Sequence, residues 1–258
     1  MDKLRIKNII RHFFGFVFPL LRRTIPNPNL YINCIEGKRG IEIGGPSQVF
    51  KDYDVLPLYK HIASLDCCNF SGSTVWEGSL NEGNNFNFYK GKTGFQFIKE
   101  AADLKGIQSE SYDFLLSSHC LEHCSNAIKA IEEWKRVVKT NGYLLIIVPD
   151  KEHTFDHNRP LTTLNHFIED FKNNIGEDDL SHMEEILKHH DLSMDKRAGT
   201  KEEFANRSIL NIENRCLHHH TFSKDNLSQL INYTGLKIVQ IEKKSPYHLI
   251  CLAQKLSA

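Results

Sequence analysis

Histidines are the residues of this sequence that could most readily move a proton, because the ordinary pKa of imidazole lies near neutral pH. The chain has fourteen histidines, and several of them fall in the short segments 119–123, 153–157 and 218–220. We predict that His157 or His123 accepts a proton from a substrate. The residues that we expect to line the substrate pocket are His153, Asp156, Arg159 and His219.

The same residues could instead bind a metal ion, since His153, Asp156 and His157 offer nitrogen and oxygen ligands and residues 218–220 could complete the set. Three consecutive histidines rarely all face one ion, because a helical or extended backbone turns neighbouring side chains in different directions. The seven cysteines include no C-x-x-C pair that would suggest zinc. We therefore predict a polar pocket with no metal, and zinc-dependent hydrolysis is the alternative.

A second stretch with chemical potential is the segment 38–47, which reads K-R-G-I-E-I-G-G-P-S. Its short β-branched run predicts a buried strand, and the glycines and proline predict a tight turn after it. Glycine lets a backbone approach a ligand closely, and ligands of open α/β sheets bind beyond the carboxyl ends of the strands. Glu42, Gly44, Gly45 and Pro46 are therefore candidates for a binding crevice, with the Glu42 carboxylate at its floor.

An acidic residue follows the glycine turn at a distance that is typical of nucleoside-binding folds. Residues 62–66 look like a second strand, which ends in Asp66 about 20 residues beyond the turn. A carboxylate at that spacing can bind ribose hydroxyls. An aspartate that simply begins a turn is the alternative.

The best-patterned part of the chain is a strand, a helix and a second strand. An apolar strand is expected at 114–118, and apolar residues recur at helical spacing from 126 to 139. Residues 143–148 are uniformly apolar, which is typical of a central strand covered on both faces. This order of elements forms a βαβ unit and implies a parallel sheet with a right-handed crossover.

The remaining segments complete the expected fold. Residues 69–94 are rich in Asn, Gly, Ser and Phe, and we interpret them as a loop or small lobe. Ser223 should cap a helix, and residues 236–241 and 247–252 look like an antiparallel hairpin. The predicted fold class is α/β, with a Rossmann-like, mostly parallel seven-stranded sheet, a C-terminal antiparallel hairpin and a helical insert after the fifth strand.

Composition suggests how the chain is divided. Residues 1–30 form a basic amphipathic segment and 31–258 the main domain, in which the insert 150–222 should cover the crevice as a lid. The apolar run at 13–21 is too short to span a bilayer, so for residues 1–23 we favour packing over peripheral membrane contact. The 32 basic and 32 acidic residues balance, which argues against a general nucleic-acid binder, and the scattered cysteines favour a cytoplasmic protein.

Together these motifs resemble the class I S-adenosylmethionine-dependent methyltransferases. Residues 41–45, I-E-I-G-G, are similar to the first motif of that family, an acid followed by a glycine turn. The most specific similarity is to the type 11 branch of the family. It begins at Tyr112 and includes the segments 118–123, S-H-C-L-E-H, and 134–142, W-K-R-V-V-K-T-N-G. The chain departs from the family pattern with G-G-P in place of G-x-G-x-G and T-N-G in place of P-G-G.

The resemblance implies a bound S-adenosylmethionine and direct in-line transfer of its methyl group to a hydroxyl or an amine of a small acceptor. Oxygen is preferred, because a histidine could take the proton of a hydroxyl. The segments 42–47, E-I-G-G-P-S, and 154–160, T-F-D-H-N-R-P, resemble segments of proteins that are often bacterial and sometimes encoded near sugar-polymer genes, which favours a carbohydrate-like acceptor. Besides the glycine turn, the implied cofactor residues are Asp66 at the ribose, Asp103 and Leu104 at the adenine, and Ser118, His119 and Leu121.

Two other functions fit part of the pattern. A nicotinamide-dinucleotide oxidoreductase also has glycines followed by an acid, although the segment 44–46 lacks the third glycine that close helix packing requires there. A cofactor-binding subunit without catalytic activity is the other alternative.

Overall fold

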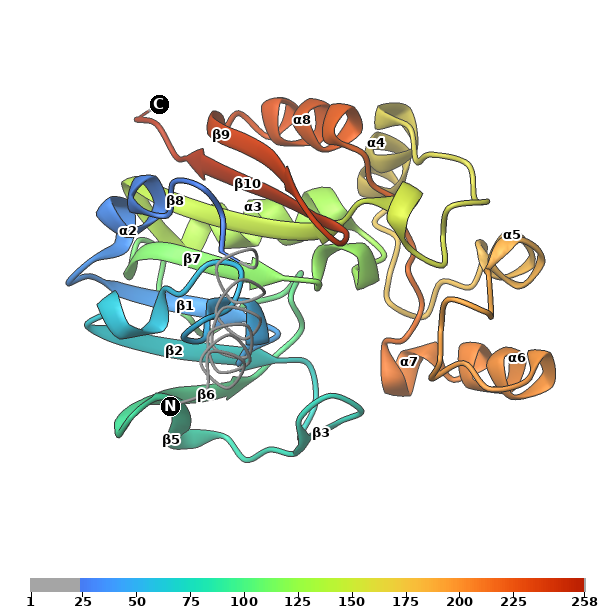
Figure 1. The fold of residues 1–258 in the computed structure, drawn as a ribbon, viewed down its shortest axis with the longest axis horizontal. Helices are drawn as coiled ribbons and strands as arrows, with labels where there is room; N and C mark the ends of the chain where they lie inside the picture. The colour runs from blue at the N-terminus through green and yellow to red at the C-terminus, as the bar shows by residue number, and fades with distance from the viewer. Residues whose placement is uncertain (1–23, 258) are drawn as a thin grey trace, which may run out of the picture.

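The structure, a computed structural model, describes residues 24–257. Its centre is an eight-stranded sheet in the order β5-β6-β2-β1-β7-β8-β10-β9 (Figure 1). The strands are β1 Arg39–Ile43, β2 Ser64–Asn69, β3 Ser73–Thr74, β4 Gly78–Ser79, β5 Gly83–Tyr89, β6 Lys92–Ile98, β7 Tyr112–Ser118, β8 Val138–Pro149, β9 Lys237–Lys244 and β10 His248–Gln254. The helices are α2 Asn29–Ile35, α3 Ala127–Val137, α4 Leu164–Lys172, α5 Met183–His189, α6 Lys201–Ile209, α7 Asn211–Asn214 and α8 Lys224–Tyr233. Four short 3-10 turns are η1 Gln48–Phe50, η2 Tyr59–His61, η3 Leu121–His123 and η4 Lys151–His153.

Five neighbouring strands, β6, β2, β1, β7 and β8, run parallel, and β9 and β10 close the sheet as an antiparallel hairpin. The predicted mostly parallel α/β fold with a C-terminal hairpin is therefore confirmed. Ile43 pairs with Cys68 on one side and Ser117 on the other, so the carboxyl ends of three strands lie at one edge. That edge is where an α/β sheet binds its ligands.

The sheet has eight strands, and the predicted number of seven is wrong. Residues 69–94, which we interpreted as a loop or lobe, contain β5 and begin β6, and these two strands pair antiparallel at the edge of the sheet. Phe86 and Phe88 are buried and alternate with exposed asparagines. Burial of one face of the strand outweighs the low strand propensity of its Asn and Gly residues.

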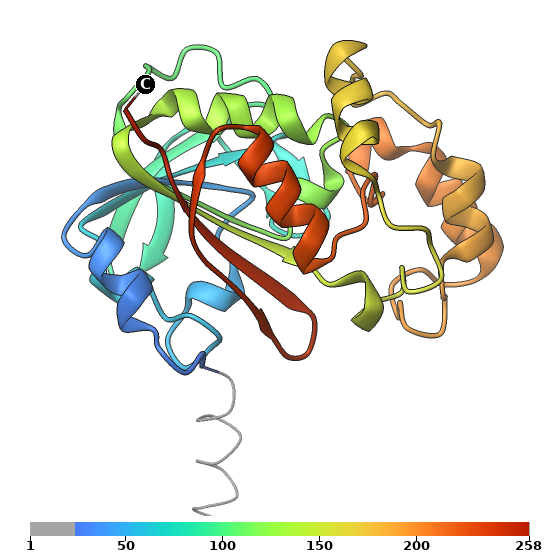
Figure 2. The same cartoon turned by 90° about the horizontal axis from the view of Figure 1, so that it is seen from above.

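The central strands are covered on both faces, as the apolar composition of residues 143–148 predicted. Leu144, Ile146 and Val148 pack with α3 and α8, while Leu145 and Ile147 pack with α2 and the segment that holds η1 and η2. Figure 2 shows α3 and α2 on opposite sides of the sheet. This alternation follows from the two-residue period of a strand.

The predicted βαβ unit is confirmed as β7, α3 and β8. The Asn126 side chain accepts a hydrogen bond from the Lys129 amide (3.0 Å) and so caps α3. Trp134 is fully buried on the inner face of the helix, and its indole N–H donates to the Ala101 carbonyl (3.0 Å). The helix is thereby fixed against both the sheet and the segment after β6.

The insert contributes helices α4 to α7, which follow β8, the fifth parallel strand along the chain. They lie beyond the carboxyl ends of the parallel strands (Figure 1). Part of the insert has a small core of its own, made by Ile186, Ala198, Phe204 and Leu217. This arrangement brings its polar residues toward the ligand-binding edge of the sheet.

Within residues 24–257, no helix is both long enough and apolar enough to cross a lipid bilayer. Most of the predicted N-terminal amphipathic segment, residues 1–23, lies outside the described residues. Its last residues are part of the fold, because Ile25 is buried and α2 begins at Asn29.

Candidate active site

A cavity of about 1030 Å³ lies at the carboxyl edge of the parallel strands. Its walls come from the turn after β1, the ends of β2 and β6, the segment around η3, and the insert. The volume suits a cofactor together with a small acceptor, since ligand sites commonly measure roughly 300–1,000 Å³. The predicted site residues that line it are Gly44, Pro46, Ser118, His119, His123 and His153.

The glycine turn depends on the absence of side chains at both glycines. Gly44 has a φ of +77°, a left-handed conformation that glycine adopts without strain. A Cβ atom on Gly45 would lie 2.3 Å from the Cδ atom of Glu42, so that carboxylate fills the space behind the turn. Ser47 donates its amide to Glu42 Oε1 (2.9 Å), and the Tyr59 hydroxyl donates to Oε2 (2.8 Å). Glu42 and Gly45 therefore shape the turn from behind and do not line the cavity.

The burial of Glu42 predicts a pH-dependent loss of stability. Burial raises the pKa of this carboxyl to about 7, against hydrogen bonds from Ser47 and Tyr59 that act to lower it. Because the folded-state pKa is the higher one, the folded protein binds a proton that the unfolded chain releases, so stability falls as pH rises from about 4.5 to 7. The decline should amount to roughly 3 kcal/mol.

The variant Glu42→Gln should not show this fall in unfolding free energy with rising pH, because glutamine does not titrate. We expect the difference in unfolding free energy between wild type and variant to change by that amount between pH 5 and pH 8, in urea denaturation curves. Other buried acids contribute equally to both proteins and cancel in the difference. A difference that is constant with pH would contradict the expectation.

The sequence suggested that Asp66 ends its strand. In the structure β2 continues to Asn69, so Asp66 lies within the strand. Its carboxylate accepts hydrogen bonds from the Tyr112 hydroxyl (2.8 Å) and the Phe95 amide (2.8 Å), and it forms an ion pair with Arg39 (3.0 Å). It does not line the cavity. The geometry gives Asp66 a role in joining β2 to β1, β6 and β7 and gives no support to a ribose contact.

The residues at the true ends of β2 and β6 line the cavity instead. Asn69 donates its side-chain amide to the Gly45 carbonyl (3.0 Å), which ties the end of β2 to the glycine turn. Glu100 and Ala101 follow β6 directly and also line the cavity. Sequence reasoning missed them because it did not recognise β6. Asp103 and Leu104, predicted at the adenine, lie on the surface and in the core respectively.

The end of β7 and the segment after it place three predicted residues differently. Ser118 and His119 line the cavity, and a His119 ring nitrogen lies 2.9 Å from a ring nitrogen of His248 on β10. Leu121 is fully buried in the core between sheet and α3, so it supports the cavity wall without reaching the cavity.

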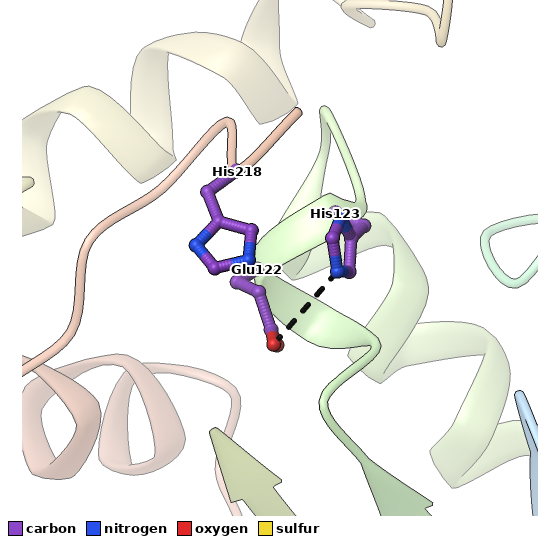
Figure 3. A group of neighbouring side chains, drawn as sticks. All are labelled: Glu122, His123 and His218. Carbon is purple, nitrogen blue, oxygen red and sulfur yellow. Dashed lines mark ion pairs between the residues drawn. The ribbon is translucent and has the colours of Figure 1, made fainter. Parts of the chain in front are cut away.

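The next two residues form a polar cluster with the end of the insert. Glu122, His123 and His218 all line the cavity, and their possible ligand atoms lie within 4.8 Å of one another (Figure 3). His123 Nε2 lies 4.0 Å from Glu122 Oε1. Burial, together with the charge of His218, lowers the pKa of His123 to about 4, so this imidazole is neutral at neutral pH. Burial acts to raise the pKa of Glu122, but the neighbouring His119, His123 and His218 outweigh it and lower that pKa.

Asp156 and Arg159 lie behind this cluster and do not line the cavity. Asp156 Oδ2 accepts a hydrogen bond from His218 Nδ1 (2.5 Å), and its other oxygen pairs with Arg159 (3.1 Å). Burial acts to raise the pKa of Asp156, but the charges and hydrogen bonds of these two partners outweigh it and lower the pKa to about 2. The pair therefore orients His218 from outside the cavity.

The other two predicted insert residues also lie away from the cavity. One ring nitrogen of His157 is 3.0 Å from the Thr154 carbonyl, and the other is 3.6 Å from Asp191. His219 is buried and contacts the Asn211 side chain (3.1 Å). Of the two histidines predicted to accept a proton, the structure therefore places only His123 at the cavity.

Two aromatic residues at the cavity have no signal in the sequence. Trp76, between β3 and β4, lines the cavity with its ring 5.4 Å from that of His123. Tyr247, at the tip of the C-terminal hairpin, lines it beside His119. Both come from turns, where a single sequence shows no periodicity that would indicate the direction of a side chain.

Several observations fit a nucleoside cofactor with a charged amino-acid end. The Ser47 hydroxyl lies beside the glycine turn at the cavity and has no hydrogen-bond partner among the described residues. Asn69 and Glu100 offer polar groups at the ends of adjacent strands, with the Phe70 ring and Ala101 next to them. Such a lining can bind hydroxyl groups and an aromatic base together.

A comparison with protein-family models agrees with a nucleoside cofactor. Residues 58–146 match the model of the type 11 methyltransferase domain family. No curated protein matches the chain. Similar solved structures include S-adenosylmethionine-dependent methyltransferases from Mesorhizobium loti (10% identity, 89% of this chain and 96% of that one, TM-score 0.49) and Methanosarcina mazei (14% identity, 92% and 100%, TM-score 0.48). Another is from Aquifex aeolicus (15% identity, 99% and 100%, TM-score 0.45).

The family match runs from just before η2 into β8, and it includes the strand ends and the η3 segment that line the cavity. It favours methyl transfer over nicotinamide chemistry and over a cofactor-binding subunit without activity. The chain therefore carries a type 11 methyltransferase domain over residues 58–146, and it is an S-adenosylmethionine-dependent methyltransferase.

Proposed function

We propose that this enzyme methylates a hydroxyl group, with an amine as the alternative, on a small or carbohydrate-like acceptor. The observation that carries the proposal is one cavity that joins the glycine turn to the neutral His123 and to polar and aromatic residues of the insert and the β3–β4 hairpin. A polar, aromatic pocket of this kind suits an uncharged acceptor with several hydroxyl groups.

S-adenosylmethionine, when bound, supplies a methyl group on a sulfonium sulfur that is already a good leaving group. The chain must therefore mainly align the two reactants. In well-oriented systems, alignment can lower the activation barrier by about 7–11 kcal/mol. Gly44, Ser47, Asn69 and Glu100 would hold the cofactor, and Ser118 and His119 would border its reactive end. These positions follow from the lining of the cavity.

His123 is the residue that we assign to the proton of the acceptor hydroxyl. Its Nδ1 atom lies 2.9 Å from the Leu217 carbonyl, which can only accept, so Nδ1 carries the hydrogen and Nε2 carries the lone pair. As the acceptor oxygen forms its bond to the methyl carbon, the carbon–sulfur bond breaks with its electron pair left on sulfur. The hydroxyl proton then passes to His123, a step that commonly contributes about 10²- to 10⁴-fold.

The insert, residues 150–222, would act as the lid of this cavity. Arg215 near its end pairs with Glu100 after β6 (2.6 Å) and lies over the Phe70 ring (5.1 Å). These contacts connect the insert to the cofactor side of the cavity and leave less room for water. Exclusion of water strengthens electrostatic interactions at a reacting centre.

Matched acceptors test the proposal. Purified full-length protein would be incubated with S-adenosylmethionine that carries a labelled methyl group and with sets of three small glycosides. The three members of a set differ at one position, which carries a hydroxyl, a hydrogen or an amino group. We expect labelled product from a hydroxyl member and none from its deoxy counterpart. Transfer to amines alone would overturn the preference for oxygen, and transfer only to acceptors unlike sugars would overturn the carbohydrate-like class.

The position of Asp66 gives a separate prediction. The variant Asp66→Asn should lose about 1–3 kcal/mol of unfolding free energy, because a buried carboxylate with three partners is weakened. Its affinity for S-adenosylmethionine, measured by calorimetry, should stay within about threefold of wild type. That range corresponds to a change of less than about 1 kcal/mol in the binding free energy. Asn69→Ala is the matched comparison at the cavity and should weaken binding more. A tenfold loss of affinity in a folded Asp66→Asn protein would instead support the ribose contact.

A further inference from the structure

Glu122 is a fully buried carboxylate in the cavity wall, and neither of its oxygens has a hydrogen-bond partner among residues 24–257. The nearest group is His119 Nδ1, which lies 3.4 Å from Oε1, at the distance of an ion pair and longer than an ordinary hydrogen bond. Buried charges in proteins are normally paired and hydrogen-bonded or bound to a metal ion. Glu122 therefore has the character of a group whose partner enters from the cavity.

The contacts of the two neighbouring histidines fix which ring nitrogen carries a hydrogen. His218 Nδ1 lies 2.5 Å from the Asp156 carboxylate, and His123 Nδ1 lies 2.9 Å from the Leu217 carbonyl. Both oxygens can only accept, so both Nδ1 atoms are donors. When the rings are neutral, as metal binding requires, the Nε2 atom of each carries the lone pair. Figure 3 shows the two rings on either side of the Glu122 side chain.

This arrangement has the features of a metal site with its outer shell in place. Histidines that bind metals commonly donate their other ring N–H to a carboxylate or a backbone carbonyl, which fixes the ring and raises its basicity. Asp156 and the Leu217 carbonyl do this here. Two histidines and one glutamate also form a known ligand set for zinc, with a further position open to water or substrate.

The distances suit a site that closes on an ion. All three ligand groups lie within 4.8 Å of one another, and His123 Nε2 is 4.0 Å from Glu122 Oε1. Ligand atoms around a tetrahedral zinc ion lie about 3.3 Å apart, given bonds of about 2.0–2.2 Å. Small rotations of the three side chains would cover the difference. We propose that Glu122, His123 and His218 bind a divalent metal ion of the zinc class, with an open coordination position toward the cavity.

The role of this ion rests on the proposed function, although its binding does not. An acceptor hydroxyl at the open position would have its pKa lowered, as zinc lowers that of water. Its proton would then leave to solvent, and His123 would serve as a ligand in place of a proton acceptor. The bonds made and broken in the transfer are otherwise those given above, with the electron pair of the carbon–sulfur bond left on sulfur.

Metal binding by the full-length protein tests the site directly. After treatment with a chelator, the protein would be titrated with Zn²⁺ against a coloured competing chelator, and with Co²⁺ while its visible absorption is recorded. We expect one tight site whose affinity falls more than 100-fold in Glu122→Gln and in His218→Asn. Asp156→Asn should lower it by about 10–100-fold, because it removes an outer-shell partner. Thermal melting would show that each variant is folded.

Two controls separate this site from other histidines. His153→Asn changes a histidine of the same cavity outside the cluster, and its metal affinity should equal that of wild type. His166, Asp170 and His220 form a second close group in the described residues, so the titrations would be repeated in a His166→Asn background. The loss caused by Glu122→Gln should persist there.

The outcomes are distinguishable. Absence of a stoichiometric site, or equal affinity in Glu122→Gln, would overturn the inference while methyl transfer could still be observed. A site that binds metal but leaves methyl transfer unchanged after its removal would overturn the catalytic role of the ion. Binding through these residues without transfer to any hydroxyl acceptor would support the site and count against the proposed function.

Discussion

Replacing Arg159 by methionine should lower the free energy of unfolding by about 3–5 kcal/mol, because it would remove one of the two positive partners of the buried Asp156 carboxylate and leave Glu185 unpaired. Arg159 lies 3.1 Å from Asp156 and 2.9 Å from Glu185, and the side chains of Arg159 and Asp156 are almost completely buried. The same guanidinium donates to the His218 carbonyl (2.7 Å). The substitution should therefore also loosen the segment that holds His218, and urea denaturation would measure the loss.

Arg197→Met is the matched control, since Arg197 also belongs to the insert but is exposed. Surface substitutions of this kind usually change stability by less than about 0.5 kcal/mol. The sequence-based prediction gave Arg159 a different role, as a direct contact of the acceptor. If that role were correct, Arg159→Met would remain as stable as wild type and would mainly raise the KM for the acceptor.

Placing an alanine at Gly45 should disrupt the turn on which the cofactor site is built. The new Cβ atom would lie 2.3 Å from Glu42 Cδ and less than 3 Å from both carboxylate oxygens, which Ser47 and Tyr59 hold in place. Overpacking of this kind typically costs about 1–3 kcal/mol. A shift of the turn by about 1 Å could also lower the rate by about 100-fold, because alignment dominates this chemistry.

Denaturation curves would measure the loss of stability, and the rate of transfer from labelled S-adenosylmethionine would measure the loss of alignment. Calorimetric titration would show whether the cofactor still binds. Gly37→Ala provides a control, because Gly37 has a positive φ but open space around its missing Cβ, so it isolates backbone strain. The double variant Glu42→Ala, Gly45→Ala should recover part of the stability, since it removes the group that the new methyl would strike. A fully stable, fully binding Gly45→Ala protein would contradict this description of the turn.

Local sequence patterns were sufficient to predict the helices and strands with strong periodicity. The apolar stripe from Ala127 to Val137 and the uniformly apolar residues 143–148 indicated a helix and a central strand, and both are present. The glycine turn after β1 was likewise visible, because glycine and proline restrict the backbone in ways that neighbours in the sequence reveal. Together with the η3 segment, these features led to the domain family whose model matches residues 58–146.

Tertiary structure alone decided which residues reach the cavity. Asp66 and Asn69 differ by three positions, yet one joins strands and the other lies at the cavity, because the end of β2 is set by pairing with β6. Asp156 and Arg159 looked like pocket residues, but the folding of the insert turned them toward each other behind His218. The sequence thus determined the fold and the presence of the chemical groups through short-range periodicity and backbone preference. Contacts between segments far apart in the chain determined their directions, since burial and pairing of charges depend on the partners that folding brings together.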